Sequence, residues 1–160
     1  MDQASKKQAL RMFTYGLYAI LCEDEGTVNG FTANWLTQVS FEPPLIAVSV
    51  ENSAKSLPMI QRSRKFTVNV LRSGQRELAG ALGKSALKHP DKMEHITYTR
   101  TQTEDRRPIL PAAQAWIACE VRHTTPAGDS TLLVAEIVDA GIIAEGEPLT
   151  MNEAGFKHAG

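Results

Sequence analysis

Two polar segments carry the residue types that could bind a planar, charged ligand. The first covers residues 34–44, where Thr37 and Gln38 lie between two apolar runs and would present hydroxyl, amide and main-chain N–H groups along one rim. Such a rim matches the carbonyl edge of a flavin ring, because donors near N1 stabilise the negative charge of the reduced ring. A polar loop that only joins two strands explains these residues equally well.

The second polar segment follows the next apolar run. Residues 52–56 combine two hydroxyls, Ser53 and Ser56, with the cation Lys55 at the predicted start of a short helix. Main-chain N–H groups and the helix dipole favour a phosphate dianion at such a place. A helix N-cap beside one solvated lysine is the commoner arrangement for this composition, so the segment alone does not establish a phosphate site.

Cysteine and histidine residues offer few other chemical centres. Cys119 and His123 are four residues apart and would share one face of a strand, but no third and fourth ligand occurs at a useful spacing, so no metal site is predicted. The four histidines are expected to be solvated or hydrogen-bonded and not catalytic acids. His158 is a weak catalytic candidate because it follows a glycine and a phenylalanine near the end of the sequence.

The composition excludes several classes of function. The chain has 160 residues, with 17 Lys and Arg against 18 Asp and Glu, and this balance creates no field that would attract nucleic acid or anionic lipid. Two cysteines are too few for a disulfide scaffold or a four-cysteine zinc site. No apolar stretch approaches the roughly 20 residues of a membrane span, and the polar first 11 residues lack the apolar core of a signal peptide. We therefore expect a cytoplasmic protein with no nucleic-acid or membrane partner, folded as a single domain over residues 1–160.

Strands dominate the pattern of apolar residues. Residues 15–22 are apolar on both alternating faces, as in a strand buried on both sides, and residues 23–26 form a polar hairpin turn. Six or seven strands, two or three short helices and turn signals between neighbouring strands favour an antiparallel barrel. The further strands are predicted at 27–35, 45–50, 66–70, 116–123 and 131–140. One short helix is predicted at 5–12, a second begins after Ser56 as its N-cap, and a third runs from Ser73 as its N-cap to Gly83 as a left-handed C-cap. Loops are predicted at 34–44 and at 84–107, and the second loop contains one weak strand at 96–99.

Longer stretches of the sequence resemble a known family. The patterns are Asn-Gly-Phe-Thr-Ala-Asn-Trp from Asn29, Thr-Gln-Val-Ser-Phe-Glu-Pro-Pro from Thr37, Phe-Thr-Val-Asn-Val-Leu from Phe66 and Gly-Asp-Ser-Thr-Leu from Gly128. In this combination and spacing they resemble the flavin reductase-like family, whose members fold as FMN-binding split barrels. The resemblance spans most of the chain and implies a mainly β fold, an antiparallel split β-barrel with a few short helices.

The resemblance also implies an activity, ligands and a site. Similar family members are homodimers that bind FMN near the subunit interface, so it implies an NAD(P)H:flavin oxidoreductase that transfers hydride from NADH or NADPH to flavin N5, with FAD less expected than FMN. By this resemblance, the residues lining the ring and ribityl chain are Thr32, Ala33, Asn34, Thr37, Gln38 and Val39. The residues on the ribityl and phosphate side are Ser49, Ser53, Lys55 and Ser56.

Two departures from the family pattern keep alternatives open. Many relatives have histidine where this chain has Ser130, and that imidazole is often placed beside the flavin and nicotinamide. Its absence favours the alternative of a flavoredoxin-type FMN electron carrier, which a protein partner reduces in place of free nicotinamide. The aromatic residue common near the C-terminus is not at Met151, although Phe156 could replace it. A ligand-free dimeric barrel that scaffolds other proteins is a third interpretation.

Overall fold

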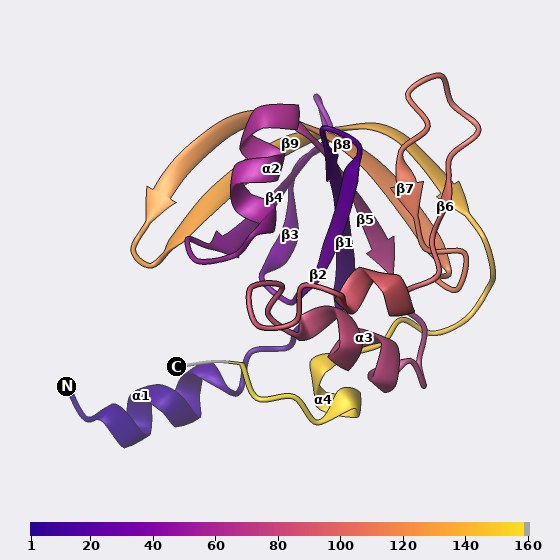
Figure 1. Cartoon of the computed structure of the whole chain (residues 1–160). Coiled ribbons are helices and arrows are strands. Elements are labelled where there is room, and N and C mark those ends of the chain that lie inside the picture. Colours follow the sequence, from indigo (N-terminus) through magenta and orange to yellow (C-terminus); the bar gives the residue numbers. More distant parts are fainter. Residues whose placement is uncertain (159–160) are drawn as a thin grey trace.

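The computed structural model describes residues 1–158 as a strongly curved antiparallel sheet with short helices around it (Figure 1). In chain order the elements are α1 (Gln3–Leu10), β1 (Tyr18–Asp24), β2 (Thr27–Ala33), β3 (Leu36–Ser40), β4 (Leu45–Glu51), α2 (Ser56–Ser63), β5 (Lys65–Val70), α3 (Arg76–Gly83), the 3-10 helix η1 (Lys92–His95), β6 (Thr99–Arg100), β7 (Pro108–Ile109), β8 (Ala115–Ala127), β9 (Ser130–Ile142) and α4 (Met151–Ala154). The expected mainly β fold with a few short helices is confirmed. Every helix within the described residues falls short of the length and apolar character needed to cross a bilayer.

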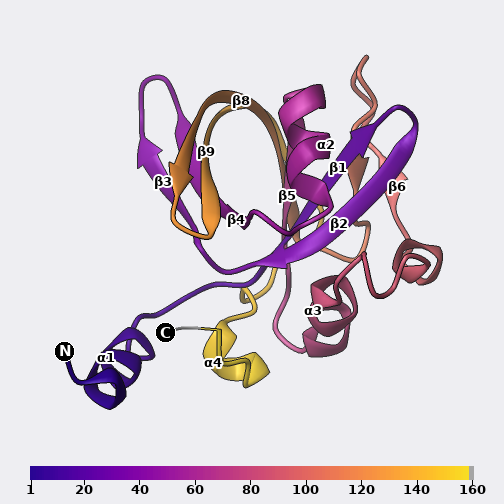
Figure 2. The same ribbon diagram turned by 60° about the vertical axis from the view of Figure 1, so that its left-hand side comes forward.

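The order of the strands explains why the main sheet closes into a barrel. Seven strands pair in the order β2-β1-β5-β8-β9-β4-β3, so β2 and β3 are the two edges of the sheet. Asn34 and Trp35 alone separate these edge strands in the sequence, and so short a link spans at most about 11 Å. The sheet must therefore curl until the end of β2 meets the start of β3, and Figure 2 shows the two strands joined there and diverging beyond the link. The barrel is split at this point, because β2 and β3 do not pair.

The strands bury side chains on both faces of the sheet. On β1, Ile20 and Cys22 face a core cluster that α2 completes, whereas Ala19 and Leu21 face a second cluster to which α3 and α4 contribute. All four side chains are fully buried. Because successive residues of a strand point to opposite faces, this arrangement confirms the interpretation of the first apolar run as a strand buried on both sides.

Part of the segment expected to be a loop at residues 34–44 is a strand, and the prediction was wrong there. β3 pairs antiparallel with β4, with Leu36 opposite Val48. The loop was inferred from polar composition, but β3 is an edge strand that leaves Thr37, Gln38 and Val39 exposed. Polar side chains are compatible with a strand at the edge of a sheet, because they meet water there instead of the core.

The helix predicted at residues 5–12 is α1, which begins and ends two residues earlier, and three predicted capping residues do not cap as expected. Ser56 is the first residue of α2 and not its N-cap, and its hydroxyl accepts a hydrogen bond from Asn29. Ser73 lies before the N-cap residue of α3, and its hydroxyl donates to a carboxylate on α4. Gly83 ends α3 without a left-handed cap, since Lys84 follows in an extended conformation. In the first two cases the hydroxyl has a partner on another element, which short-range capping rules do not consider.

The long hairpin of β8 and β9 curves around the barrel (Figure 2). Its register shifts between Val121 and His123, so one residue bulges out of the ladder. The bulge leaves Cys119 in the core and His123 exposed. The two side chains therefore do not share a face, although their spacing predicted that they would.

Candidate functional site

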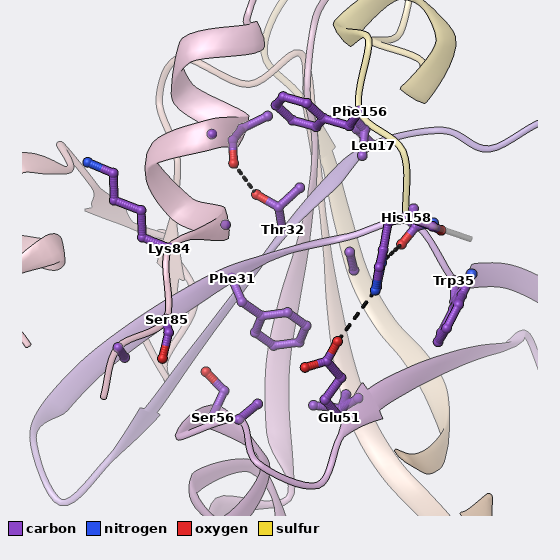
Figure 3. A pocket seen from close by; sticks show the side chains of 18 of the residues that line it. Leu17, Phe31, Thr32, Trp35, Glu51, Ser56, Lys84, Ser85, Phe156 and His158 are labelled. Atoms are coloured by element: carbon purple, nitrogen blue, oxygen red, sulfur yellow. Dashed lines mark hydrogen bonds and ion pairs between the residues drawn. The ribbon is translucent and has the colours of Figure 1, made fainter. Parts of the chain in front are cut away.

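A cleft with a volume of about 1000 Å³ opens beside the split between β2 and β3 (Figure 3). Most of its lining comes from four parts of the chain: β2 with Trp35, the end of β4 with the turn into α2, α3 with the segment that follows it, and the C-terminal segment from Met151. Leu17, Phe31 and Phe156 give it apolar walls. Its size lies within the range of small-molecule sites, and its apolar walls and polar ends suit a ligand with a flat ring and a charged tail.

Positive charge dominates the cleft. Among the described residues that line it, five are lysines and Glu51 alone is a carboxylate. The lysines are Lys55, Lys84, Lys88, Lys92 and Lys157. Such an excess in a partly enclosed cleft favours an anionic ligand.

Ser53, Lys55 and Ser56 lie together where β4 turns into α2. Ser53 and Lys55 are exposed, whereas Ser56 is buried and its hydroxyl accepts a 2.7 Å hydrogen bond from the side-chain amide of Asn29. This bond fixes the start of α2 against β2. Burial raises the pKa of the neighbouring Cys22 thiol to about 11, so the cysteine stays neutral. The corner therefore offers hydroxyls and an ammonium group to a ligand, with no thiolate to repel an anion.

The opposite wall is held by a hydrogen bond between β2 and α3. Thr32 Oγ1 donates to the main-chain carbonyl of Ala79 at 2.6 Å (Figure 3). The end of α3 approaches the same threonine, because a Cβ added at Gly83 would lie 3.9 Å from its side chain. Lys84 and Ser85 follow directly and line the cleft. The end of β2 is thus held between α2 on one side and α3 on the other.

The C-terminal tail closes one end of the cleft through His158. Its Nδ1 lies 3.1 Å from Oδ1 of Asn34, and its Nε2 lies 3.4 Å from Oε1 of Glu51. The imidazole also stacks on Trp35, with ring centres 4.9 Å apart and an interplanar angle of 17°. Figure 3 shows His158 between Trp35 and Glu51. The weak catalytic candidate therefore contacts Asn34, one of the residues predicted to bind the ligand.

Seven of the ten residues predicted to bind a cofactor line this cleft. They are Thr32, Ala33, Asn34, Ser49, Ser53, Lys55 and Ser56. The other three, Thr37, Gln38 and Val39, lie on β3 with exposed side chains and are not part of the lining. Since β3 pairs with β4 on one side only, main-chain groups on its other side are unpaired in the sheet.

Sequence reasoning missed the cations that the segment after α3 brings to the cleft. Lys84, Lys88 and Lys92 lie in the stretch 84–107, where no regular pattern indicated which side chains face a ligand. The regular spacing of four residues between these lysines was the feature of the sequence that could have indicated that they face one ligand. Burial lowers the pKa of Lys92, and the nearby charge of Lys55 lowers it as well.

Comparisons with known proteins found a matching family model and several flavin reductases among the relatives. The family model described as "Flavin reductase like domain" matches residues 10–160. An NADH-dependent flavin reductase of Rhodococcus sp. is 30% identical, over 94% of this chain and 83% of its own. The reductase component of 4-hydroxyphenylacetate 3-monooxygenase from Thermus thermophilus is 27% identical, over 94% of this chain and 93% of its own. The solved structure of the flavin reductase PheA2 is 32% identical and covers 99% of this chain and 98% of its own, with a TM-score of 0.79.

Proposed function

The chain belongs to the flavin reductase-like family, and on that premise we propose that its lysine-rich cleft is the site where flavin and nicotinamide react. It is an NAD(P)H:flavin oxidoreductase, since flavin reductases are similar to it over most of its length. A bound flavin supplies the ring whose N5 accepts hydride from the nicotinamide. One observation supports this location of the active site. The cleft at the split of the barrel combines residues typical of phosphate sites, apolar walls and an excess of positive charge.

The two ends of the cleft suggest how a flavin would lie in it. Ser53, Lys55 and Ser56 would hold the phosphate, and the end of β2, from Thr32 to Asn34, would lie along the ring and ribityl chain. The free main-chain edge of β3, at Thr37, Gln38 and Val39, would face the ring carbonyls. The chain would then act mainly by orientation, because two stacked reactants in a partly dry cleft react as if in one molecule.

We propose FMN as the flavin and NADH as the preferred reductant. One phosphate dianion matches the two hydroxyls and the ammonium group before α2, and relatives are named as NADH-dependent. Steady-state rates with FMN or FAD, each paired with NADH or NADPH, test both preferences. The highest kcat/KM is expected for FMN with NADH, and a higher value for FAD or for NADPH would overturn the corresponding preference.

Binding of FMN to the protein is the first test of the site. A ligand that binds only the folded chain stabilises it by about 2.7 kcal/mol at a hundredfold excess over Kd. We therefore expect the melting temperature to rise with FMN concentration. A melting temperature that is independent of FMN would support the ligand-free scaffold and contradict the proposal.

An FMN electron carrier reduced by a protein partner remains the second candidate. Ser130, at the position where many relatives have histidine, is buried and its hydroxyl donates to Oδ1 of Asp129 at 3.2 Å. It is not among the residues that line the cleft. A carrier would hold FMN tightly and leave it oxidised after rapid mixing with NADH or NADPH, whereas a reductase would bleach the flavin absorbance.

We propose that the protein is a homodimer that pairs through β3 and the second half of β9. Phe41 is 87% exposed and Ile142 is 81% exposed, and Val39 and Val138 are also exposed. The main-chain N–H of Ile137 donates to a carbonyl in the turn after β3, so these segments are neighbours. Light scattering of the protein and of Phe41→Asp tests this, with a dimer expected for the first and a monomer for the second. A monomeric unmodified protein would contradict it.

We further propose a cytoplasmic location and delivery of reduced flavin to a second protein. Two free buried thiols suit a reducing compartment. A monooxygenase component is the class of partner suggested by the relative from Thermus thermophilus, which is named as a reductase component. Co-purification of the tagged chain from its native cells, followed by identification of the bound proteins, tests the partner, and recovery of an electron donor protein in its place would favour the carrier.

A further inference from the structure

Lys92 is a buried cation among the residues that line the cleft. The residue is 6% exposed, and its ammonium group donates to the carbonyls of Leu82 at 2.9 Å and Lys84 at 2.8 Å. These carbonyls lie at the C-terminal end of α3, where no left-handed cap satisfies them. A lysine ammonium has three N–H donors, so one remains beyond the two that close the helix.

Within the described part of the chain no carboxylate pairs with Lys92, and its partners are the carbonyls at the C-terminal end of α3, the negative end of the helix dipole. None of the ion pairs found there includes it. The neighbouring charge is a second cation, Lys55, and the buried thiol of Cys22 is neutral. Carbonyl dipoles offset only part of the cost of burying a full charge, and proteins usually pair a buried charge with an opposite one. A counter-ion supplied by a ligand would remove this cost.

The cleft is the side from which that counter-ion can come. Lys92 lines it together with Lys55, Ser56 and Lys84. The ammonium group of Lys92 donates to the carbonyl of Lys84, so it also fixes the start of the segment that follows α3 and lines the cleft. Lys92 is thus bonded to the end of α3 and lines the same cleft as the hydroxyl and ammonium groups at the start of α2.

We propose that the Lys92 ammonium binds the phosphate ester of a nucleotide in the cleft, as a partner of Lys55 on the opposite side of the same anion. This inference rests on the proposed function, because it takes the phosphate to belong to the flavin or to the nicotinamide dinucleotide. Phosphate is favoured over a carboxylate, since a dianion compensates two neighbouring lysines. Lys92 is therefore assigned a binding role in addition to its structural role at the end of α3.

The test compares FMN with riboflavin, which lacks the phosphate. Dissociation constants for both are measured by flavin fluorescence for the unmodified protein, Lys92→Met, Lys92→Arg and, as a matched control on the remote helix α1, Lys7→Met. A charge-assisted contact to phosphate predicts that Lys92→Met reduces the preference for FMN over riboflavin by about ten- to a hundredfold. Lys92→Arg should restore much of the preference, and Lys7→Met should leave it unchanged.

The same variants distinguish the source of the phosphate. If Lys92→Met leaves the flavin preference unchanged and raises the KM for NADH at least tenfold, the phosphate belongs to the dinucleotide and the proposal stands. Equal weakening of FMN and riboflavin with an unchanged KM for NADH would show a structural role alone and overturn it.

Flavin binding and pyrophosphate protection of the unmodified protein also test the phosphate site. Neither measurement requires a folded Lys92→Met variant or flavin turnover. Riboflavin that binds the unmodified protein as tightly as FMN, together with no protection from thermal unfolding by inorganic pyrophosphate, would refute the phosphate site without any variant. Failure of the unmodified protein to bind either flavin would refute the proposed function instead. Pyrophosphate that protects the unmodified protein and Lys92→Arg, but not Lys92→Met, would still support the anion site in that case.

Discussion

Lys55 tests the proposed phosphate end of the cleft at the scale of a single residue. Its side chain is exposed and lines the cleft beside two hydroxyls, so its removal should affect binding more than folding. Lys55→Ala is expected to weaken FMN binding by about ten- to a hundredfold, which corresponds to about 1.5 to 3 kcal/mol. Isothermal titration measures this, with Lys7→Ala as the control. An unchanged Kd would place the phosphate elsewhere.

His158 tests whether the site uses a protein acid. A general acid contributes at least about a hundredfold to a rate, but hydride transfer to a flavin requires none. We therefore expect His158→Gln to change kcat by less than about tenfold and to change ligand affinity, because the imidazole covers Trp35 and contacts Asn34. Steady-state kinetics separate the two effects. A hundredfold loss of kcat at unchanged KM would make His158 catalytic.

Residue types alone pointed to one end of the cleft, although they did not establish a phosphate site there. Ser53, Lys55 and Ser56 are close in sequence, so their composition already indicates an anion site and the cleft contains all three. Lys92 could not be predicted in this way, because nothing in a polar segment indicates which lysine is buried. Its position follows from packing between α3 and η1, which are joined by an irregular connection.

An ion pair between β1 and β6 gives a prediction at the scale of elements. Arg100 donates to both carboxylate oxygens of Glu23, at 2.6 and 2.8 Å, and these hydrogen bonds hold the pKa of Glu23 below its usual value. A carboxyl group whose pKa is lowered by folding stabilises the protein above its unfolded pKa of about 4.5, and this contribution is lost as the pH falls through its folded value. Urea unfolding should show Glu23→Gln less stable by up to about 1 kcal/mol at pH 7, and the difference should shrink below pH 4.5.

The matched control for this ion pair is Glu25→Gln in the adjoining hairpin turn, whose side chain is exposed and has no ion-pair partner within residues 1–158. Its stability relative to the unmodified protein should show no corresponding change between neutral and acidic pH. If the difference between Glu23→Gln and the unmodified protein does not depend on pH, the ion pair does not stabilise the β1–β6 contact.

Elements with a clear apolar pattern were predicted, whereas those that depend on position in the sheet were not. The first apolar run became β1 because its alternate residues fill two cores. β3 was missed because an edge strand needs few apolar residues, and its exposed residues 37–39 resemble a loop. The prediction ended this strand at residue 123, whereas β8 continues to Ala127, because residues 122–127 are all exposed and carry no alternation of apolar and polar side chains.

The reactivity of the two cysteines tests whether the whole molecule unfolds as one cooperative unit. Cys22 on β1 and Cys119 on β8 belong to one core cluster and are fully buried, and burial raises their pKa values to about 11 and about 12. We propose one cooperative domain, so both thiols should be unreactive toward a thiol reagent at pH 8 and become reactive together in urea. Mass spectrometry of the modified protein follows each site. Rapid native modification of either thiol, or separate transitions for the two, would contradict this.

The barrel class could be predicted from the number of strands and turns, but its closure could not. Closure follows from the strand order, in which consecutive strands β2 and β3 become opposite edges of one sheet. That order arises from pairings between segments far apart in the sequence, such as β1 with β5 and β4 with β9. The same pairings create the split beside which the cleft lies, so the site is a property of the whole fold.

Anaerobic reduction of protein-bound FMN by NADH, followed by visible absorbance in a stopped-flow instrument, tests whether this barrel is a flavin reductase. The flavin band should bleach rapidly with the protein present and far more slowly for the same mixture without protein, and the bleaching rate should saturate with NADH. Flavin that stays oxidised with both NADH and NADPH, or that bleaches no faster than without protein, would contradict the assignment.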